Sequence, residues 1–264
     1  MNAPLIMGIL NCTPDSFSDG GRFNETRVAV DHALSMINAG ADWIDVGGES
    51  TRPGAEHVPV DMELNRVVPV VRELVAADAG IRISVDTSSS IVAHEAIRAG
   101  ATMINDVRAG TADASMFDVA AEANVPMILM HMRGEPRTMQ DEPQYNDVVR
   151  DVHSFLAERV QAARAAGVRT VYVDPGIGFG KTLEHNLTLL ANLSAFADLA
   201  DGIVLGISRK RFLGALTGIT DPADRDTPTA LTHALLWHAP VHMIRVHNVE
   251  LHARLRTIAS ALRG

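Results

Sequence analysis

Short apolar runs rich in β-branched residues alternate along the chain with longer segments of helical period. This alternation is typical of a parallel sheet whose strands are joined by helices. Each apolar run is short enough for a buried strand, and polar residues follow it. The expected strands cover residues 5–11, 42–47, 81–87, 102–107, 126–131, 170–174, 202–208 and 242–248.

The segments between the expected strands carry helix stop signals. Residues 26–40, 61–80 and 88–100 each end on a glycine, the residue that commonly follows a helix, and Ser88 or Ser89 can cap the third segment. Eight such units in 264 residues predict an α/β protein, a closed (β/α)8 TIM barrel with residues 1–264 as one domain. The alternative is an open doubly wound sheet, but its Gly-rich dinucleotide turn is replaced here by NCTPDSFSDGG.

Composition narrows the classes of function. A net charge of −9 at pH 7 disfavours nucleic acid as the main partner, and 47% apolar residues suffice for a large core. No apolar run reaches the length of about eighteen residues that a membrane helix needs, and the N-terminus lacks the features of a signal peptide. We therefore expect a cytoplasmic protein. The single cysteine, Cys12, excludes an intrachain disulfide and is expected to be a packing residue.

The basic residues are unevenly chosen. Of 23 basic residues only Lys181 and Lys210 are lysines. Since the chain otherwise uses arginine, a retained lysine can mark a position that requires a compact ammonium group, with chance retention as the alternative.

Polar residues stand where the expected strands end, and barrel enzymes place their catalytic groups there. Some of these residues simply mark the end of a buried strand, but the set is mostly carboxylate and amide, which favours an active site. The set consists of Asn11, Asp45, Asp86, Asn105, Asp106, His131, Asp174, Ser208, Arg245 and His247.

Three of the loops that follow are long, as binding loops and lids often are. The first, CTPDSFSDGGRFNE, is the best candidate for a lid, with Gly20 and Gly21 as hinges. The second, GGESTRPGAEHVPV, places Ser50, Thr51 and Arg52 before a Pro–Gly turn, and the fifth is MRGEPRTMQDEPQ.

Two later motifs indicate an anion or small-molecule site. DPGIGFGKT has glycines that allow close approach of a ligand, but it lacks the spacing of a P-loop, which excludes nucleotide hydrolysis. SRKRFLG follows the seventh strand, where barrels often bind phosphate. Arg245 and His247 alternate on the eighth strand and, beside Asn11, predict an anion clamp. No structural metal site has the right spacing, but Mg²⁺ shared with phosphate oxygens stays possible.

These motifs together resemble the dihydropteroate synthase family. The blocks that carry the resemblance run from Ile6 to about Val249 and are MGILNCTPDSFSDGG, IDVGGESTRPGA, SVDT, GATMINDV, LMHMRG, DPGIGFGKT, SRKRFLGAL and IRVHNV. The resemblance implies a transferase that condenses 6-hydroxymethyl-7,8-dihydropterin diphosphate with p-aminobenzoate and releases diphosphate. It also implies a homodimer and a folate-pathway enzyme of the kind that sulfonamides target.

The resemblance assigns roles to residues of this chain. The pterin would bind inside the barrel, the diphosphate in the clamp with Mg²⁺ assisting at Asn11, and the aminobenzoate under the first two loops. Asp86, Lys210 and Asn11 would act in catalysis. The implied pterin-binding residues are Asp86, Asn105, Asp174, Lys210, Met130 and Phe179. The implied diphosphate-binding residues are Asn11, Thr51, Arg52, Arg245 and His247. The implied residues on the aminobenzoate side are Phe17, Asp19, Pro53 and Arg211. Three of the polar residues at strand ends receive no role in this way and are expected to be structural: Asp45, Asp106 and His131.

The chain departs from the family pattern at three positions. Cys12 stands where valine is common, Asn248 where the family often has Asp, and Arg211 where some members have Ser. Arg211 could meet the aminobenzoate carboxylate or leave it to backbone groups. Two other functions remain alternatives: a pterin-binding paralogue without activity, which would lose the clamp or lid first, and a methyltetrahydrofolate methyltransferase, against which the SRK and TPDSFSDGG motifs speak.

The lysine argument yields the first prediction. Lys210→Arg should remove most of the activity although the charge is kept, because the planar guanidinium cannot reproduce the geometry of a compact ammonium. Steady-state kinetics of the variant measure this, and near-normal kinetics would show that the reasoning about the retained lysines is wrong.

Overall fold

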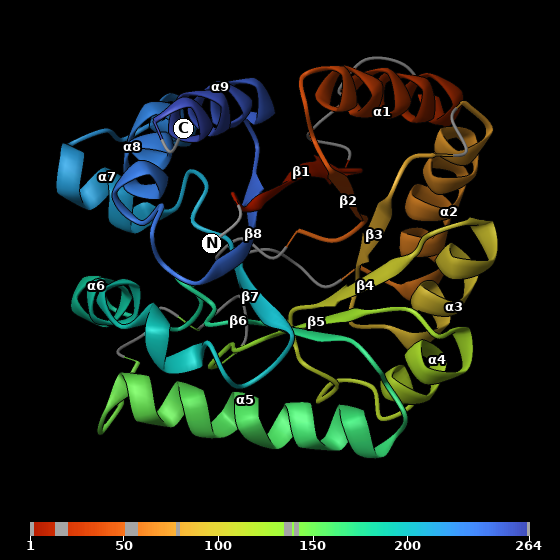
Figure 1. Cartoon of the computed structure of the whole chain (residues 1–264). Helices are drawn as coiled ribbons and strands as arrows, with labels where there is room; N and C mark the ends of the chain where they lie inside the picture. Colours follow the sequence, from red (N-terminus) through yellow and green to blue (C-terminus); the bar gives the residue numbers. More distant parts are fainter. Residues whose placement is uncertain are drawn as a thin grey trace.

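The computed structural model describes residues 3–13, 21–50, 58–77, 80–134, 139 and 143–262. Within these residues eight parallel strands pair in chain order, and β1 pairs with β8 to close a barrel (Figure 1). The fold is therefore the expected (β/α)8 barrel. The strands are β1 (Leu5–Asn11), β2 (Trp43–Gly47), β3 (Ile83–Asp86), β4 (Met103–Asp106), β5 (Met127–Met130), β6 (Val171–Asp174), β7 (Gly202–Leu205) and β8 (Val241–Val246).

Helices surround the barrel on its outside, and Figure 1 shows them as a ring around the strands. They are α1 (Gly21–Asn38), α2 (Val60–Ala77), α3 (Ser90–Ala99), α4 (Met116–Ala123), α5 (Val148–Ala165), α6 (Leu183–Ala191), α7 (Arg211–Thr217), α8 (Asp226–Leu235) and α9 (Val249–Ala261). The described part of the chain also has the 3₁₀ helices η2 (Leu193–Phe196) and η3 (Pro222–Arg225). None of its helices combines the length and apolar character that crossing a membrane requires.

The expected strands are all found; β1 has the expected bounds, and the other strands are shorter than the expected runs. In the run 202–208 the strand ends at Leu205. Ile207 belongs to the apolar run although it follows the strand, since it is buried in the core outside the barrel. The cap of α3 is at Ser89, whose side chain accepts from the Val92 N–H, and Gly100 follows the helix with φ of 117°. The first loop is shorter than expected, since α1 already begins at Gly21, one of the two expected hinges.

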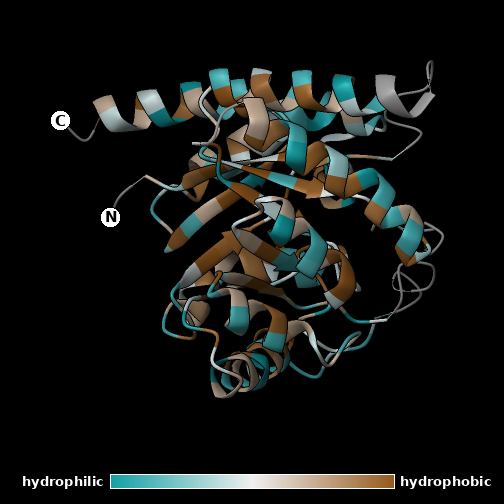
Figure 2. Cartoon of the chain, turned by 90° about the vertical axis from the view of Figure 1, so that its right-hand side faces the viewer, coloured by the Kyte–Doolittle hydropathy of each residue, from teal (hydrophilic) through white to brown (hydrophobic). Residues whose placement is uncertain are grey.

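Two separate apolar regions hold the barrel. The larger lies between the strands and the helices, where the brown strands of Figure 2 meet the apolar sides of helices that are teal elsewhere. The smaller fills the amino-terminal end of the barrel interior, and its side chains belong to strand residues that alternate with those of the outer core. It consists of Met7, Trp43, Met103, Ile128, Val204 and Met243. This interior cluster is the apolar floor on which the polar residues described below rest.

The last helix is fastened to the first βα unit by one carboxylate. Asp42 accepts a hydrogen bond from the backbone N–H of Ile6 at 2.7 Å and one from Arg256 Nη1 at 2.6 Å. Arg256 also donates to the backbone carbonyl of Gly40 at 2.9 Å. Asp42 therefore joins α9, β1 and the segment before β2 at the place where the barrel closes.

This contact predicts a stability effect. Asp42→Ala should lower the free energy of unfolding by about 2–3 kcal/mol, because it removes a charge-assisted hydrogen bond and leaves a backbone N–H unpaired. Urea unfolding with an unchanged m-value measures the loss. Asp31→Ala is the matched control: its partner Arg27 lies 4.0 Å away and both side chains are exposed, so the loss should stay below about 0.5 kcal/mol. Equal losses in the two variants would contradict the role of Asp42.

Candidate active site

Above the apolar floor, the barrel interior becomes polar. Asp45 and Asp86 follow Trp43 and Ser84 on the inward side of their strands, and Asn105 follows Met103. The strand register pairs Asp45 with Ser84 and Asp86 with Asn105, so these side chains lie in neighbouring positions around the barrel. The carboxyl ends of the strands thus carry the polar layer that the sequence predicted.

Arg245 lies between two buried acids. Its Nε donates to Asp45 Oδ2 and its Nη2 donates to Asp86 Oδ2, both at 2.6 Å. Asp45 is fully buried and also accepts a hydrogen bond of 2.9 Å from Asn105 Nδ2. Because the amide nitrogen of Asn105 is used in this way, its Oδ1 is the side-chain atom that can accept from a ligand.

Asp45 is a site residue that sequence reasoning placed among the structural ones. The strand-end pattern identified it, but its partners Asn105 and Arg245 lie 60 and 200 residues away along the chain. Nothing local distinguishes it from Asp106. That residue does have the structural role expected of it, since it accepts from Ser88 Oγ and from the backbone N–H groups of Arg108 and Gly110.

Burial changes the proton affinity of Asp86. It raises the pKa of the carboxyl from its usual value near 3.8 to about 7, although Arg245 lowers it, and the charges of Asp45 and Glu63 raise it further. A carboxyl group with this pKa exists in both protonation states near neutral pH. Perturbed groups of this kind in a cleft are typical of active sites.

Asp174 and Lys210 face each other on the other side of the barrel. Asp174 Oδ1 accepts from the backbone N–H of Gly176 at 2.7 Å, which leaves Oδ2 to accept from a ligand. A Cβ at Gly206 would lie 3.4 Å from Asp174 Oδ2 and 3.9 Å from Lys210 Nζ, so both charged groups lie beside this glycine. Met130, which is buried, pairs in register with Asp174.

The Lys210 ammonium group is held by the loop after β6. Nζ donates to the backbone carbonyl of Ile177 and lies 4.4 Å from the ring centroid of Phe179. Burial lowers the pKa of Lys210 to about 8, while Asp174 acts to raise it. Lys210, Phe179 and Asp174, which the resemblance assigns to the pterin, are therefore brought together.

Lys181, the second retained lysine, is buried beneath this loop. Its Nζ donates to the backbone carbonyl of Phe179 at 3.0 Å and lies 2.9 Å from His131 Nδ1. The adjacent Gly176 has φ of 69°, and a Cβ there would lie 1.8 Å from the carbonyl oxygen of His131. Lys181 and Gly176 thus pack the loop after β6, which carries Phe179, tightly against the end of β5.

The expected anion clamp is described in part. Asn11 ends β1 and is half-buried, while His247 follows β8 and its Nδ1 lies 2.9 Å from Ser208 Oγ. Ser208 also accepts from the backbone N–H of His247 at 3.1 Å, so it fixes the position of that ring. Arg245, which is also an expected member of the clamp, donates to Asp45 and Asp86 as described above.

Several expected site residues lie outside the described residues. Arg211 is described: it begins α7 and is exposed. Within the described ranges no group of three or more His, Cys, Asp or Glu side chains could hold a metal ion. The expected site residues that lie outside the described residues are Phe17, Asp19, Thr51, Arg52 and Pro53.

Comparison with known proteins gives a consistent result. Residues 7–247 match the family of pterin binding enzymes. The dihydropteroate synthase of Escherichia coli is 45% identical over 252 residues, which cover 95% of this chain and 88% of that protein. That of Bacillus subtilis is 45% identical over 260 residues, covering 98% and 88%.

Solved structures agree with the sequence matches. The structure of Xanthomonas albilineans dihydropteroate synthase with 4-aminobenzoic acid superposes with a TM-score of 0.92 at 44% identity, covering 99% of this chain and 94% of that one. The same enzyme in complex with 7,8-dihydropteroate gives a TM-score of 0.89 at 40% identity, with the same coverage. The chain therefore belongs to the pterin-binding enzymes and, within them, to the dihydropteroate synthases, which are transferases of folate synthesis.

Proposed function

We propose that the protein joins 6-hydroxymethyl-7,8-dihydropterin diphosphate to p-aminobenzoate in the polar layer of its barrel, and that residues 1–264 form one domain for this purpose. The observation that carries the proposal is the set of buried acceptors, Asp86, Asn105 and Asp174, placed opposite one ammonium donor, Lys210. An amino-pyrimidine edge offers the complementary pattern, because it has N–H donors beside a carbonyl oxygen.

The contacts within the layer support one role for each group. Asp174 Oδ2 and Asn105 Oδ1 would accept from the pterin, because the other polar atom of each side chain is already hydrogen-bonded to the protein. Lys210 would donate to the carbonyl oxygen or a ring nitrogen. Phe179 and Met130 would pack against the rings, since both lie beside this pair.

The clamp would hold the leaving group. In the reaction the bond between the exocyclic methylene carbon and the diphosphate oxygen breaks, and its electron pair leaves with diphosphate. Asn11 and His247, together with Thr51, Arg52 and Arg245, would stabilise the negative charge that develops on these oxygens. The Asp86 carboxylate would stabilise the cation left on the pterin. The amine of p-aminobenzoate then attacks the methylene carbon and loses a proton to solvent.

Asn11 fits a magnesium ion shared with the substrate. Its side-chain oxygen is the kind of hard ligand that Mg²⁺ prefers, and it is half-buried at the end of β1, next to the clamp. The remaining ligands would be diphosphate oxygens and water, because Mg²⁺ commonly uses few protein groups. The ion would neutralise part of the diphosphate charge, and Asn11 would hold the ion in position.

The aminobenzoate side rests on the resemblance. Phe17, Asp19 and Pro53 would close over this substrate, and Arg211, exposed one residue after Lys210, would lie near its carboxylate. The cytoplasmic location expected from the sequence also stays a prediction.

A homodimer would use the outer face of α8 and α9. These helices pack on each other and expose large apolar side chains that a monomer would leave in water. They are Leu231, Leu235 and Ile258, together with Leu262 directly after α9.

Product formation tests the proposed reaction. Purified protein with Mg²⁺ and both substrates should yield dihydropteroate and diphosphate, detected by mass spectrometry, with no requirement for a corrinoid. Wild-type protein without one substrate and the Asp174→Ala variant with both are the controls. Absence of product over the whole range from about pH 6 to pH 9 would refute the reaction.

The raised pKa of Asp86 and the lowered pKa of Lys210 predict how the activity depends on pH. The kcat/KM for the pterin substrate should rise as pH rises through about 7, because Asp86 must be ionised, and fall as pH rises through about 8, because Lys210 must be protonated. Asp86→Asn should remove the acid limb. Lys210→Arg should remove the alkaline limb from its residual activity, because guanidinium keeps its proton. A flat profile, or limbs unaffected by these variants, would contradict the assignment.

A further inference from the structure

Arg209, the middle residue of the SRK motif, has an unusual backbone conformation. Its φ is 60°, in the left-handed region that a residue with a long side chain seldom adopts. The residues on either side both reach the site: Ser208 contacts His247, and Lys210 lies near Phe179 and Asp174. The turn at Arg209 lets the two residues that flank it, Ser208 and Lys210, reach two different parts of the site.

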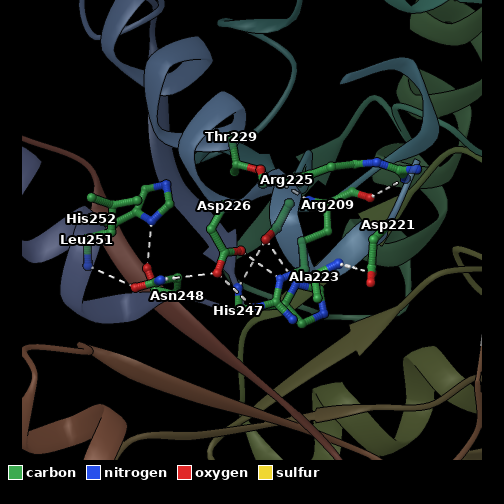
Figure 3. A network of polar contacts seen from close by, with 11 residues as sticks. Arg209, Asp221, Ala223, Arg225, Asp226, Thr229, His247, Asn248, Leu251 and His252 are labelled. Atoms are coloured by element: carbon green, nitrogen blue, oxygen red, sulfur yellow. Dashed lines mark hydrogen bonds and ion pairs between the residues drawn. The ribbon is translucent and has the colours of Figure 1, made fainter. Parts of the chain in front are cut away.

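One neighbouring segment, residues 225–229, holds both the backbone and the guanidinium of Arg209. Its backbone N–H donates to Thr229 Oγ1 and its backbone carbonyl accepts from Arg225 Nη1, both at 3.1 Å. Its guanidinium forms a bidentate pair with Asp226, Nε to Oδ1 at 2.6 Å and Nη2 to Oδ2 at 2.8 Å (Figure 3). Strained backbone persists only where the surroundings determine it, and such strain gathers at functional sites.

Asp226 also reaches the end of β8. Asn248 Nδ2 donates to Asp226 Oδ2 at 3.1 Å, and Asn248 Oδ1 accepts from the backbone N–H of Leu251, which caps α9 (Figure 3). An aspartate at 248 would place one acceptor against another here. This chain therefore carries the carboxylate at 226 and the amide at 248.

We propose that Asp226 is a positioning residue: with Asn248, it fixes Arg209 so that Ser208 holds His247 and Lys210 faces Asp174. The inference rests on the roles proposed above for Lys210 and His247. Partial burial acts to raise the pKa of Asp226, but hydrogen bonds from Arg209 and Asn248 bring it below its usual value, so the carboxylate stays charged at neutral pH.

Asp226→Asn is the first test. It removes the charge of the bidentate pair with little change in shape, so kcat/KM for the pterin substrate should fall about tenfold, mainly through KM. Asp221→Asn is the matched control. Asp221 is also an acid of this segment, but it accepts from the backbone N–H of Ala223 at 2.8 Å, so its loss should change kcat/KM by less than about twofold. Equal kinetics of the two variants would overturn the proposal.

Exchanging the two side chains is the second test. Asn248→Asp alone should lower kcat/KM, because two carboxylates then face each other. Combining Asp226→Asn with Asn248→Asp should give a kcat/KM above that of Asp226→Asn but below that of wild type, because the contact between positions 226 and 248 is rebuilt with its ends exchanged while Arg209 still lacks its carboxylate partner. A double variant no better than Asp226→Asn would refute the coupling of these positions.

A measurement on the ligand-free protein separates this inference from the reaction itself. Burial lowers the pKa of Lys210, so this pKa should rise in Asp226→Asn, where the segment around Arg209 is held less tightly and Lys210 is more exposed to water. The pKa of Lys210 should stay unchanged in Asp221→Asn. Nitrogen-15 NMR of the lysine side chain measures it, with thermal unfolding to establish that each variant is folded. Wild-type protein that makes no dihydropteroate would refute the proposed function, but an unchanged Lys210 pKa in folded Asp226→Asn would refute the positioning role.

Discussion

Arg245 holds the polar layer of the barrel together. Asp45 and Asp86 are both buried, and an ionised carboxylate without a partner is costly to bury. One guanidinium donates to both, and its planar fork can do this where a lysine ammonium has no matching geometry. Removing it would leave two buried acids facing each other without a cation between them, and one of these acids, Asp45, also accepts from the amide of Asn105. The charge state of Asp86 and the surroundings of Asn105 are therefore linked through the same arginine.

The polar layer in turn depends on the apolar floor beneath it. Met7, Trp43, Met103 and the other floor residues alternate with outward-facing residues of the larger core, so each strand presents first an apolar and then a polar side chain to the interior. A slip of one residue in the register would turn both layers outward, which is why barrel closure and site geometry are one constraint. The contact of Asp42 with Ile6 and Arg256 stabilises that closure at the opposite end.

Local pattern was enough to predict the strands, but it could not predict the partners of their terminal residues. Alternation placed Arg245 and His247 near each other and near Asn11, yet β8 ends at Val246 and the two side chains take different partners. Arg245 is long enough to reach two acids, and these acids lie on strands that are far from it along the chain. For the same reason Asp45 looked structural. The special conformation of Arg209 left no trace in the sequence, because glycine is the usual indication of positive φ.

The two retained lysines now each have a physical explanation. Burial lowers the pKa of Lys210 to about 8, and its ammonium group lies between Ile177, Phe179 and Asp174, where a compact donor fits. Burial, with the charge of Lys210, lowers the pKa of Lys181 well below its usual value, and the pKa of its neighbour His131 is lowered to about 2, so His131 is the neutral partner in this contact. An arginine at position 181 would bring a larger group with a fixed charge into the same buried space beside Lys210. A compact side chain is thus required at both positions.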